Sequence, residues 1–228
     1  MNQQKTLICV AVGIASIDEA LEIAHEEQQG ADIIEIRLDM LSEPAIKPFV
    51  EKISAPLLFT YRPDWEGGNF TGRETERLET LLEAASGGAS FIDCELRAPA
   101  ETKAALLAHT AESGCCLILS YHDFEKTPDQ ATLENIVLQM QQYDGAIGKI
   151  VTTAADYLDV LRVLKLQEQA ADLNFPLIGF CMGDPGRISR VATARLGGFM
   201  TYCAPRANQG TASGQLSAEQ LQQLLAQL

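Results

Sequence analysis

The stretch Ala146-Ile147-Gly148-Lys149-Ile150-Val151 is a run of apolar and β-branched residues that carries a single charge, on Lys149. Its length and composition are typical of one buried strand. A lysine in such a strand loses its hydration, so the fold must compensate for its burial. One interpretation is a gatekeeper lysine on an edge strand. The other is an amine nucleophile, because desolvation and nearby cations favour the neutral, reactive form.

Seven other segments share the pattern of a short buried strand, and helical patterns fill most of the gaps between them. The expected strands are Thr6–Val12, Ile33–Arg37, Leu57–Tyr61, Phe91–Glu95, Cys116–Tyr121, Ala146–Val151, Leu177–Cys181 and Phe199–Cys203. Strands that alternate with helices predict a parallel sheet. Eight such units in 228 residues favour an α/β fold, a single (β/α)₈ TIM barrel over residues 1–228, rather than an open doubly wound sheet.

Helix signals support this alternation. Ser16-x-x-Glu19 has the form of a capping box, and Thr127-Pro128-x-Gln130 is expected to cap the helix after the fifth strand. The remaining helices are expected over Pro44–Ile53, Thr75–Ala85, Ala98–Glu112, Asp156–Gln169, Ile188–Leu196 and from Ser217 onward.

Composition narrows the possible partners and compartment. A hydrophobic content of 46% is ample for a large core, and a net charge of −14 argues against a nucleic-acid or anionic-membrane surface. The six cysteines form no C-x-x-C pair and are expected to be buried free thiols in a reducing cytoplasm. The first apolar run is too short for a membrane or secretory segment. We therefore predict a cytoplasmic protein with no membrane or nucleic-acid partner.

Polar residues cluster where the predicted strands end, and the active sites of barrels lie at the carboxyl ends of the strands. Alternation directs Glu35 and Arg37 to the same side of the second strand. The other candidates at strand ends or in the loops that follow are Arg62, Glu66, His122, Lys149, Met182, Arg190 and Gln215. The loop Ala204 to Gly214, which precedes Gln215, has the composition of a mobile lid that would exclude water.

Each candidate also has a simpler explanation. Glu35 and Arg37 could form a structural ion pair, Arg62 and Arg190 could lie on the surface, and His122 could be a buried core histidine. The other two histidines, His25 and His109, fall within predicted helices, where a solvated face accounts for them.

Common cofactor motifs are missing. The chain has no H-x-H or H-E-x-x-H sequence, no P-loop and no G-x-G-x-x-G fingerprint. Ser120 and His122 lack the strand-elbow context of a hydrolase nucleophile. The sequence therefore gives little support for a metal site and does not suggest a nucleotide cofactor.

A site with one lysine, one histidine and three arginines suits an anionic carbonyl substrate. Lys149 would attack the ketone to form an iminium, which acidifies the adjacent carbon. His122 has a suitable pKa range for removing that proton and returning it to a leaving hydroxyl. An arginine offers a bidentate fork to a carboxylate, and the cationic neighbours would help to keep Lys149 neutral.

In their order on successive strand ends, these residues resemble the type I 3-dehydroquinate dehydratase family along essentially the whole chain. The matching pieces are Glu35-Ile36-Arg37, Arg62-x-x-x-Glu66-Gly67-Gly68, Ser120-Tyr121-His122-Asp123-Phe124, Lys149, Met182-Gly183, Ile188-Ser189-Arg190 and Gly214-Gln215. Thr211 stands where the family often has a serine, so it keeps a hydroxyl and adds a methyl group.

The resemblance implies a shikimate-pathway lyase that loses water from 3-dehydroquinate in the syn sense, giving 3-dehydroshikimate without metal or cofactor. It implies that Lys149 forms the Schiff base, that His122 is the general acid and base, and that Glu66 orients His122. The substrate-binding residues that it implies are Glu35, Ile36, Arg37, Arg62, Met182, Arg190, Thr211 and Gln215. A homodimer is also expected from the resemblance.

Two other functions remain open from the sequence. One is another Schiff-base barrel, such as a class I aldolase, which would use the same lysine but break a carbon–carbon bond. The other is a catalytically silent barrel that senses a hydroxylated carboxylic acid. Turnover of 3-dehydroquinate to a conjugated enone would exclude the aldolase, and loss of function in Lys149→Met would exclude the sensor.

Overall fold

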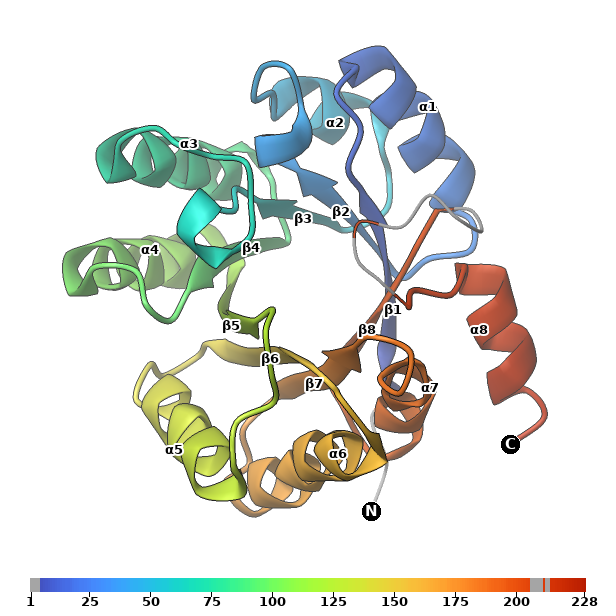
Figure 1. The fold of residues 1–228 in the computed structure, drawn as a ribbon. Coiled ribbons are helices and arrows are strands. Elements are labelled where there is room, and N and C mark those ends of the chain that lie inside the picture. Colours follow the sequence, from blue (N-terminus) through green and yellow to red (C-terminus); the bar gives the residue numbers. More distant parts are fainter. Residues whose placement is uncertain (1–4, 206–210, 212–213) are drawn as a thin grey trace.

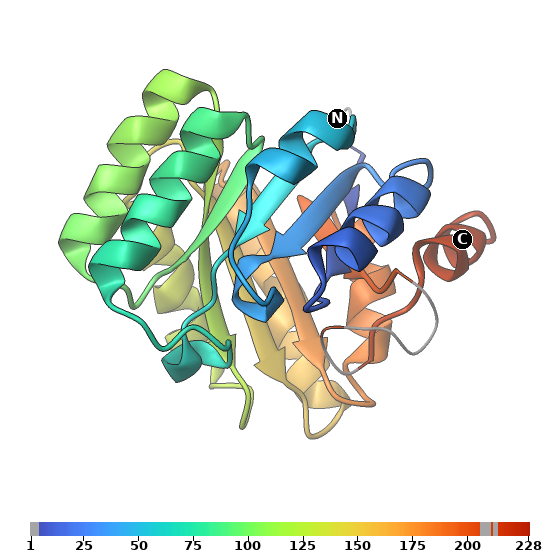
Figure 2. The ribbon, with the colours of Figure 1, turned by 90° about the horizontal axis from the view of Figure 1, so that it is seen from above.

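The computed structural model describes residues 5–205, 211 and 214–228, and these residues form a ring of eight parallel strands surrounded by helices (Figure 1). The strands are β1 (Leu7–Val12), β2 (Ile33–Arg37), β3 (Leu57–Thr60), β4 (Phe91–Glu95), β5 (Cys116–Asp123), β6 (Ile147–Thr153), β7 (Leu177–Met182) and β8 (Met200–Cys203). Figure 2 shows the same barrel from the side, with the helices outside the strands.

The order of the strands confirms the predicted barrel. The sheet runs β7-β6-β5-β4-β3-β2-β1-β8, so that β1 pairs with both β2 and β8. Cys9 of β1 is in register with Ile33 on one side and Tyr202 on the other. At the remaining seam, the Phe199 amide donates to the Leu177 carbonyl at 2.9 Å. The open doubly wound alternative is therefore wrong.

A helix follows each strand, as the alternation predicts. They are α1 (Ile17–Glu27), α2 (Lys47–Lys52), α3 (Glu74–Gly87), α4 (Ala100–Ser113), α5 (Gln130–Gln141), α6 (Tyr157–Asp172), α7 (Arg187–Arg195) and α8 (Ala218–Leu225), with short 3₁₀ turns at Leu38–Met40 and Asp64–Glu66. Ser16 caps α1 as expected, since its side chain accepts from the Glu19 amide.

The cap of α5 lies two residues after Thr127, the residue expected from the sequence. The helix is capped by Asp129, whose carboxylate accepts from the Thr132 amide at 2.8 Å. The Thr127 hydroxyl instead contacts Thr152 and Thr153 at the end of β6. Thr127 therefore anchors the β5–α5 connection to the barrel, and Asp129 caps the helix.

Two apolar cores hold the barrel together, as expected when alternate strand residues face opposite sides. The larger core lies between the sheet and the helices and includes Ile34, Phe49 and Leu106. The smaller one fills the barrel interior and includes Ile33 and Ile118. All six cysteines are free thiols; five are buried as predicted, and Cys116 is only partly buried.

Strands β5 and β6 extend two residues beyond their predicted ends because they pair with each other as far as Asp123 and Thr152, and Thr153 pairs with Met182 of β7. His122 is in register with Val151, and Asp123 with Thr152. Since β6 lies between β5 and β7, Lys149 is on an interior strand, and the edge-strand interpretation is wrong. Within the described residues, none of the helices has the length and apolar character needed to cross a bilayer.

Candidate active site

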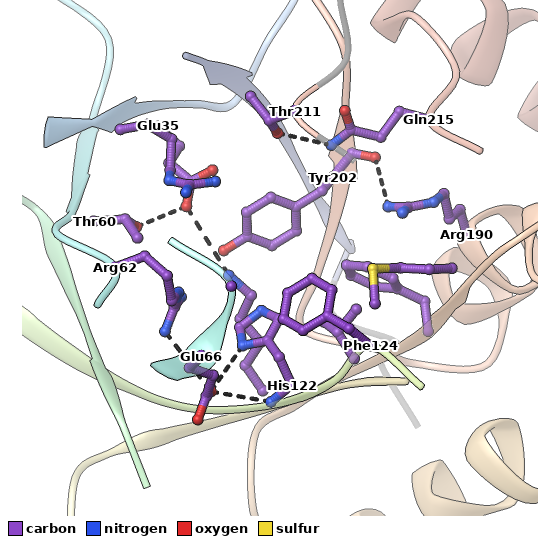
Figure 3. A pocket seen from close by; sticks show the side chains of 16 residues that line it. Glu35, Thr60, Arg62, Glu66, His122, Phe124, Arg190, Tyr202, Thr211 and Gln215 are labelled. Carbon is purple, nitrogen blue, oxygen red and sulfur yellow. Dashed lines mark hydrogen bonds and ion pairs between the residues drawn. The ribbon is translucent and has the colours of Figure 1, made fainter. Parts of the chain in front are cut away.

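A pocket opens at the carboxyl ends of the strands, and it brings together every predicted site residue except Ile36. Its lining residues are Glu35, Arg37, Thr60, Arg62, Glu66, Gly67, His122, Phe124, Lys149, Val151, Phe180, Met182, Arg190, Tyr202, Thr211 and Gln215. Figure 3 shows Glu35, Arg62, Glu66 and His122 on one side of this pocket and Arg190 on the other. The site therefore assembles residues from β2, β3, β5, β6, β7 and β8 and from the loops that follow some of these strands.

Ile36, which was predicted to bind substrate, does not line the pocket. Glu35 and Arg37 line the pocket, and the strand alternation that brings them there turns Ile36 to the opposite face. Ile36 is 1% exposed and belongs to the core between the sheet and the helices. Its contribution is to packing of the barrel wall.

Lys149 lies inside the barrel with carboxylates as its nearest charged neighbours. Its Nζ donates to Asp93 Oδ2 at 3.1 Å and lies 4.0 Å from Glu35 Oε1. It also lies 4.2 Å from the centroid of the Tyr202 ring. The cationic neighbours that were expected to help keep Lys149 neutral are not among these closest contacts. The contact with Asp93 fixes the position of Nζ in the pocket.

Asp93 is itself held by Arg62, the centre of a buried ionic network. Arg62 Nη2 lies 2.7 Å from Asp93 Oδ1, and Nη1 lies 2.5 Å from Glu95 Oε1 and 2.7 Å from Ser120 Oγ. Burial would raise the pKa of Asp93, but Arg62 and Lys149 hold it well below its usual range. The Asp93 carboxylate is therefore charged and positions Lys149 at physiological pH.

Glu66 fixes the orientation of His122. Glu66 Oε1 accepts from the His122 backbone amide and contacts His122 Nδ1, both at 3.0 Å, and Oε2 lies 2.8 Å from Arg97 Nη2. Burial, with Arg62 and Lys149, lowers the pKa of His122 well below its usual value, so the imidazole is neutral. With a charged Glu66, Nδ1 carries the proton and Nε2 presents a free lone pair to the pocket.

The loop between β3 and α3 shapes this side of the pocket through two glycines. Gly67 has φ +75°, and a Cβ there would lie 2.4 Å from the Phe124 ring. A Cβ on Gly68 would lie 2.0 Å from the Arg62 carbonyl oxygen. Only glycine fits such close approaches, and Phe124 in turn stacks on His122 with ring centroids 5.9 Å apart.

Arg190, at the opposite side, is held by aromatic and backbone contacts. Its guanidinium lies 4.4 Å from the Phe180 ring centroid, and Nη1 donates to the Tyr202 carbonyl at 3.5 Å. The residue is 1% exposed, and burial lowers its pKa to about 10. The surface interpretation of Arg190 is therefore wrong, and so is that of Arg62, which is 4% exposed.

The remaining predicted residues lie at the rim. Arg37 forms a bidentate ion pair with Asp39 at 2.8 and 2.6 Å, which replaces the pair with Glu35 considered from the sequence. Gln215 Nε2 donates to Thr211 Oγ1 at 3.4 Å. The predicted lid falls mostly on residues 206–210 and 212–213, which lie outside the described part of the chain.

Sequence reasoning missed Asp93, Glu95 and Tyr202. All three are polar residues in short buried strands, at the alternate positions that face the barrel interior. The rule that identified Glu35 and Arg37 on β2 would have found them. The sequence offers little support for a metal site. Over the described ranges, the His, Cys, Asp and Glu side chains form no group of three or more that could hold a metal ion.

The fold and the pocket together define a class of protein, a parallel (β/α)₈ barrel with a buried lysine and a glutamate-bound histidine at the carboxyl ends of its strands. Residues 8–228 match the family model described as type I 3-dehydroquinase. A curated 3-dehydroquinate dehydratase from Desulfotalea psychrophila is 48% identical over 219 residues, which is 96% of each chain. One from Methanococcus maripaludis is 31% identical over 96% of this chain and 98% of the relative.

Solved structures agree with the sequence relatives. The type I 3-dehydroquinate dehydratase from Clostridium difficile superposes with a TM-score of 0.90 and 26% identity, over 100% of this chain and 93% of that one. The enzyme from Aquifex aeolicus gives 0.82 and 31%, over 98% and 99%. The chain belongs to the type I 3-dehydroquinase family. Its activity is therefore that of a hydro-lyase, the dehydration of 3-dehydroquinate, which sets aside the aldolase and the sensor.

Proposed function

We propose that this hydro-lyase works through a Schiff base on Lys149, with His122 as general acid and base. The observation that carries the proposal is the shared pocket. It contains a lysine anchored by Asp93 at 3.1 Å and a neutral imidazole anchored by Glu66 at 3.0 Å. These two side chains come from neighbouring strands, β6 and β5, so both can reach one substrate.

Nζ of Lys149 adds to the C3 carbonyl of 3-dehydroquinate and gives two protons to the carbonyl oxygen, which leaves as water, so that the iminium forms. The iminium draws electrons from carbon 2, and Nε2 of His122 removes a proton there. His122 then gives this proton to the hydroxyl on carbon 1, which leaves as water on the same face. Hydrolysis of the product imine releases 3-dehydroshikimate and restores Lys149.

The substrate carboxylate is assigned to the side of Arg190 and Gln215, and Thr211 supports Gln215. Arg190 is a buried cation whose pKa is lowered by burial, so a bound anion stabilises its charged form. Glu35, Arg37 and Arg62 line the side that faces the ring hydroxyls, and Met182 packs against the ring.

Reductive trapping tests the proposal directly. Borohydride added during turnover of 3-dehydroquinate should reduce the imine and leave a stable adduct on Lys149, located by peptide mass mapping. Lys103 is an internal control, because it is also buried but donates to the Leu96 and Ala98 carbonyls outside the pocket. An adduct on Lys103, or none on Lys149, would contradict the proposal.

The histidine role has its own readout. His122→Ala should still form the trappable imine but lose roughly 10²–10⁴-fold in turnover, the usual contribution of a positioned acid or base. The exposed His25 on α1 provides a matched variant, His25→Ala, that should leave turnover unchanged. A His122→Ala enzyme with a wild-type rate would reassign the base.

We also propose that residues 1–228 act as one catalytic domain in the cytoplasm and assemble as a homodimer. Six free cysteines suit a reducing compartment. The homodimer stays a prediction, and light scattering of the purified protein would give the mass that tests it.

A further inference from the structure

Tyr202 is a pocket residue that the proposed reaction leaves without a role. It comes from β8 and is 4% exposed inside the barrel. Its hydroxyl is buried and has no hydrogen-bond partner among the described residues. Buried polar atoms in native proteins nearly always have a partner, because an unsatisfied hydroxyl costs stability. An orphan hydroxyl in the wall of a binding pocket therefore indicates a partner that arrives with the substrate.

The position of this side chain relates it to one part of the reaction. The face of the Tyr202 ring lies 4.2 Å from Lys149 Nζ, measured to the ring centroid. Figure 3 shows the ring in the middle of the pocket, with its hydroxyl on the side of Glu35 and Thr60. The nearby polar groups already have partners, since Thr60 donates to Glu35 at 2.7 Å and Lys149 donates to Asp93.

The chemistry of the hydroxyl makes it a donor. Burial and the neighbouring Glu35 raise the pKa of Tyr202 well above its usual value, so the phenol keeps its proton. A carbonyl oxygen is purely an acceptor and matches such a donor. When Nζ bonds to the carbonyl carbon, the carbonyl oxygen lies only two bonds from Nζ, on a carbon held next to the Tyr202 ring.

We propose that the Tyr202 hydroxyl donates a hydrogen bond to the oxygen of the substrate carbonyl that Lys149 attacks. This assignment rests on the Schiff-base reaction proposed above. In that step a carbon–nitrogen bond forms, the carbonyl π electrons move onto oxygen, and this oxygen then leaves as water. Overall, an ammonium and a ketone give an iminium and water, and both protons of the water come from the lysine nitrogen. A donor fixed at the oxygen stabilises the negative charge that develops there.

The ring and the hydroxyl have separate effects. The aromatic face attracts the positive charge on Nζ, both as ammonium and as iminium, and phenylalanine would keep that contact. The hydroxyl alone can act on the carbonyl oxygen. Tyr202→Phe therefore removes the proposed interaction and leaves the packing and the cation–π contact in place.

Two measurements on Tyr202→Phe test the assignment. In rapid-quench experiments with borohydride, imine formation on Lys149 should slow by roughly 10²-fold, the effect of removing one donor to a developing oxyanion. The melting temperature of the ligand-free protein should stay the same or rise, because the variant no longer buries an unsatisfied hydroxyl. Tyr143→Phe, outside the pocket at the end of α5, is the matched control and should change neither quantity.

The possible outcomes separate the two proposals. Imine formation at the wild-type rate in Tyr202→Phe would overturn the assignment and leave the Schiff base intact. A lower melting temperature with an unchanged rate would make Tyr202 a packing residue. Absence of a Lys149 adduct in the wild-type protein would remove the Schiff base itself, and the assignment of Tyr202 with it.

Discussion

Two buried arginines, Arg62 and Arg190, face each other across the pocket and are held in opposite ways. Asp93 and Glu95 surround Arg62; although burial opposes its charge, these carboxylates raise its pKa above the usual value. Arg190 lies against the Phe180 ring, and burial lowers its pKa to about 10. The protein stabilises the first charge and destabilises the second.

This difference indicates that one arginine supports the structure of the site and the other binds the substrate. The charge of Arg62 is balanced inside the barrel wall, where it holds the Asp93 carboxylate that positions Lys149. The charge of Arg190 is stabilised when an anion enters the pocket. Substitutions at the two arginines should therefore fail in different measurements, one in unfolding and the other in substrate binding.

Arg62→Leu should have the largest effect. It leaves Asp93 and Glu95 buried without their shared cation, and breaking a buried pair in this way costs about 3–5 kcal/mol. The free energy of unfolding in urea should fall by that amount at pH 8. Without Arg62, the pKa values of Asp93 and Glu95 rise. A carboxyl whose pKa is higher in the folded than in the unfolded protein stabilises the fold at low pH, and this stabilisation is lost as the pH rises through the folded pKa. The deficit should therefore be smaller at pH 5.

Arg73→Leu is the matched control, because Arg73 is exposed and pairs with Glu76 at 2.7 Å. Its unfolding curve should overlie that of the wild type, since exposed ion pairs contribute little. An Arg62→Leu protein as stable as this control would show that the network does not support the barrel.

Arg190→Leu should leave the fold intact and weaken substrate binding. Loss of the partner of a desolvated carboxylate costs roughly 2–5 kcal/mol, which should be seen as a higher KM for 3-dehydroquinate. The control is Arg195→Leu, an exposed arginine at the far end of α7. If KM stays at the wild-type value, the substrate carboxylate binds elsewhere, and Arg190 does not have the binding role that distinguishes it from Arg62.

Glu66 connects the structural half of the site to catalysis, and it titrates near neutrality. Burial raises its pKa to about 7, against the lowering effect of Arg62. Below that pH a protonated Glu66 no longer requires the proton on His122 Nδ1, so the free lone pair on Nε2 is lost. Turnover should therefore fall below about pH 7. Glu66→Gln should remove this acid limb and lower the plateau, and an unchanged limb would assign the titration to another group.

The raised pKa of Glu66 should also make the stability of the fold depend on pH. A carboxyl pKa raised from 4.5 to about 7 favours the fold below pH 4.5 and loses that contribution as pH rises through 7. At roughly 1.4 kcal/mol per unit, the carboxylate costs about 3 kcal/mol at pH 8. Glu66→Gln should recover part of this in urea unfolding at pH 8 and none of it at pH 4.

The barrel was predictable from the sequence because the alternation of buried strands and amphipathic helices repeats eight times. Within the site, His122 was also predictable from its strand end, since the parallel topology brings those ends together, and Lys149 was predictable as the one charge in an apolar strand. Asp93 and Tyr202 were missed although the same alternation applies to them, because the short strands that carry them otherwise resemble ordinary buried core. The partner of Arg37 was missed for a different reason, because Asp39 follows β2 in a turn whose direction depends on tertiary packing.

Thr211→Val gives the smallest expected effect and sharpens the Arg190 side of the comparison. The variant keeps the side-chain volume and removes the hydroxyl that accepts from Gln215 Nε2 at 3.4 Å. A neutral hydrogen bond contributes about 0.5–1.5 kcal/mol, so KM should rise about 2- to 10-fold with little change in unfolding. Thr211→Ser, which keeps the hydroxyl, should behave as wild type. If the serine variant is as impaired as the valine variant, the methyl group and its packing against Gly13 position this segment, and the hydrogen bond to Gln215 does not.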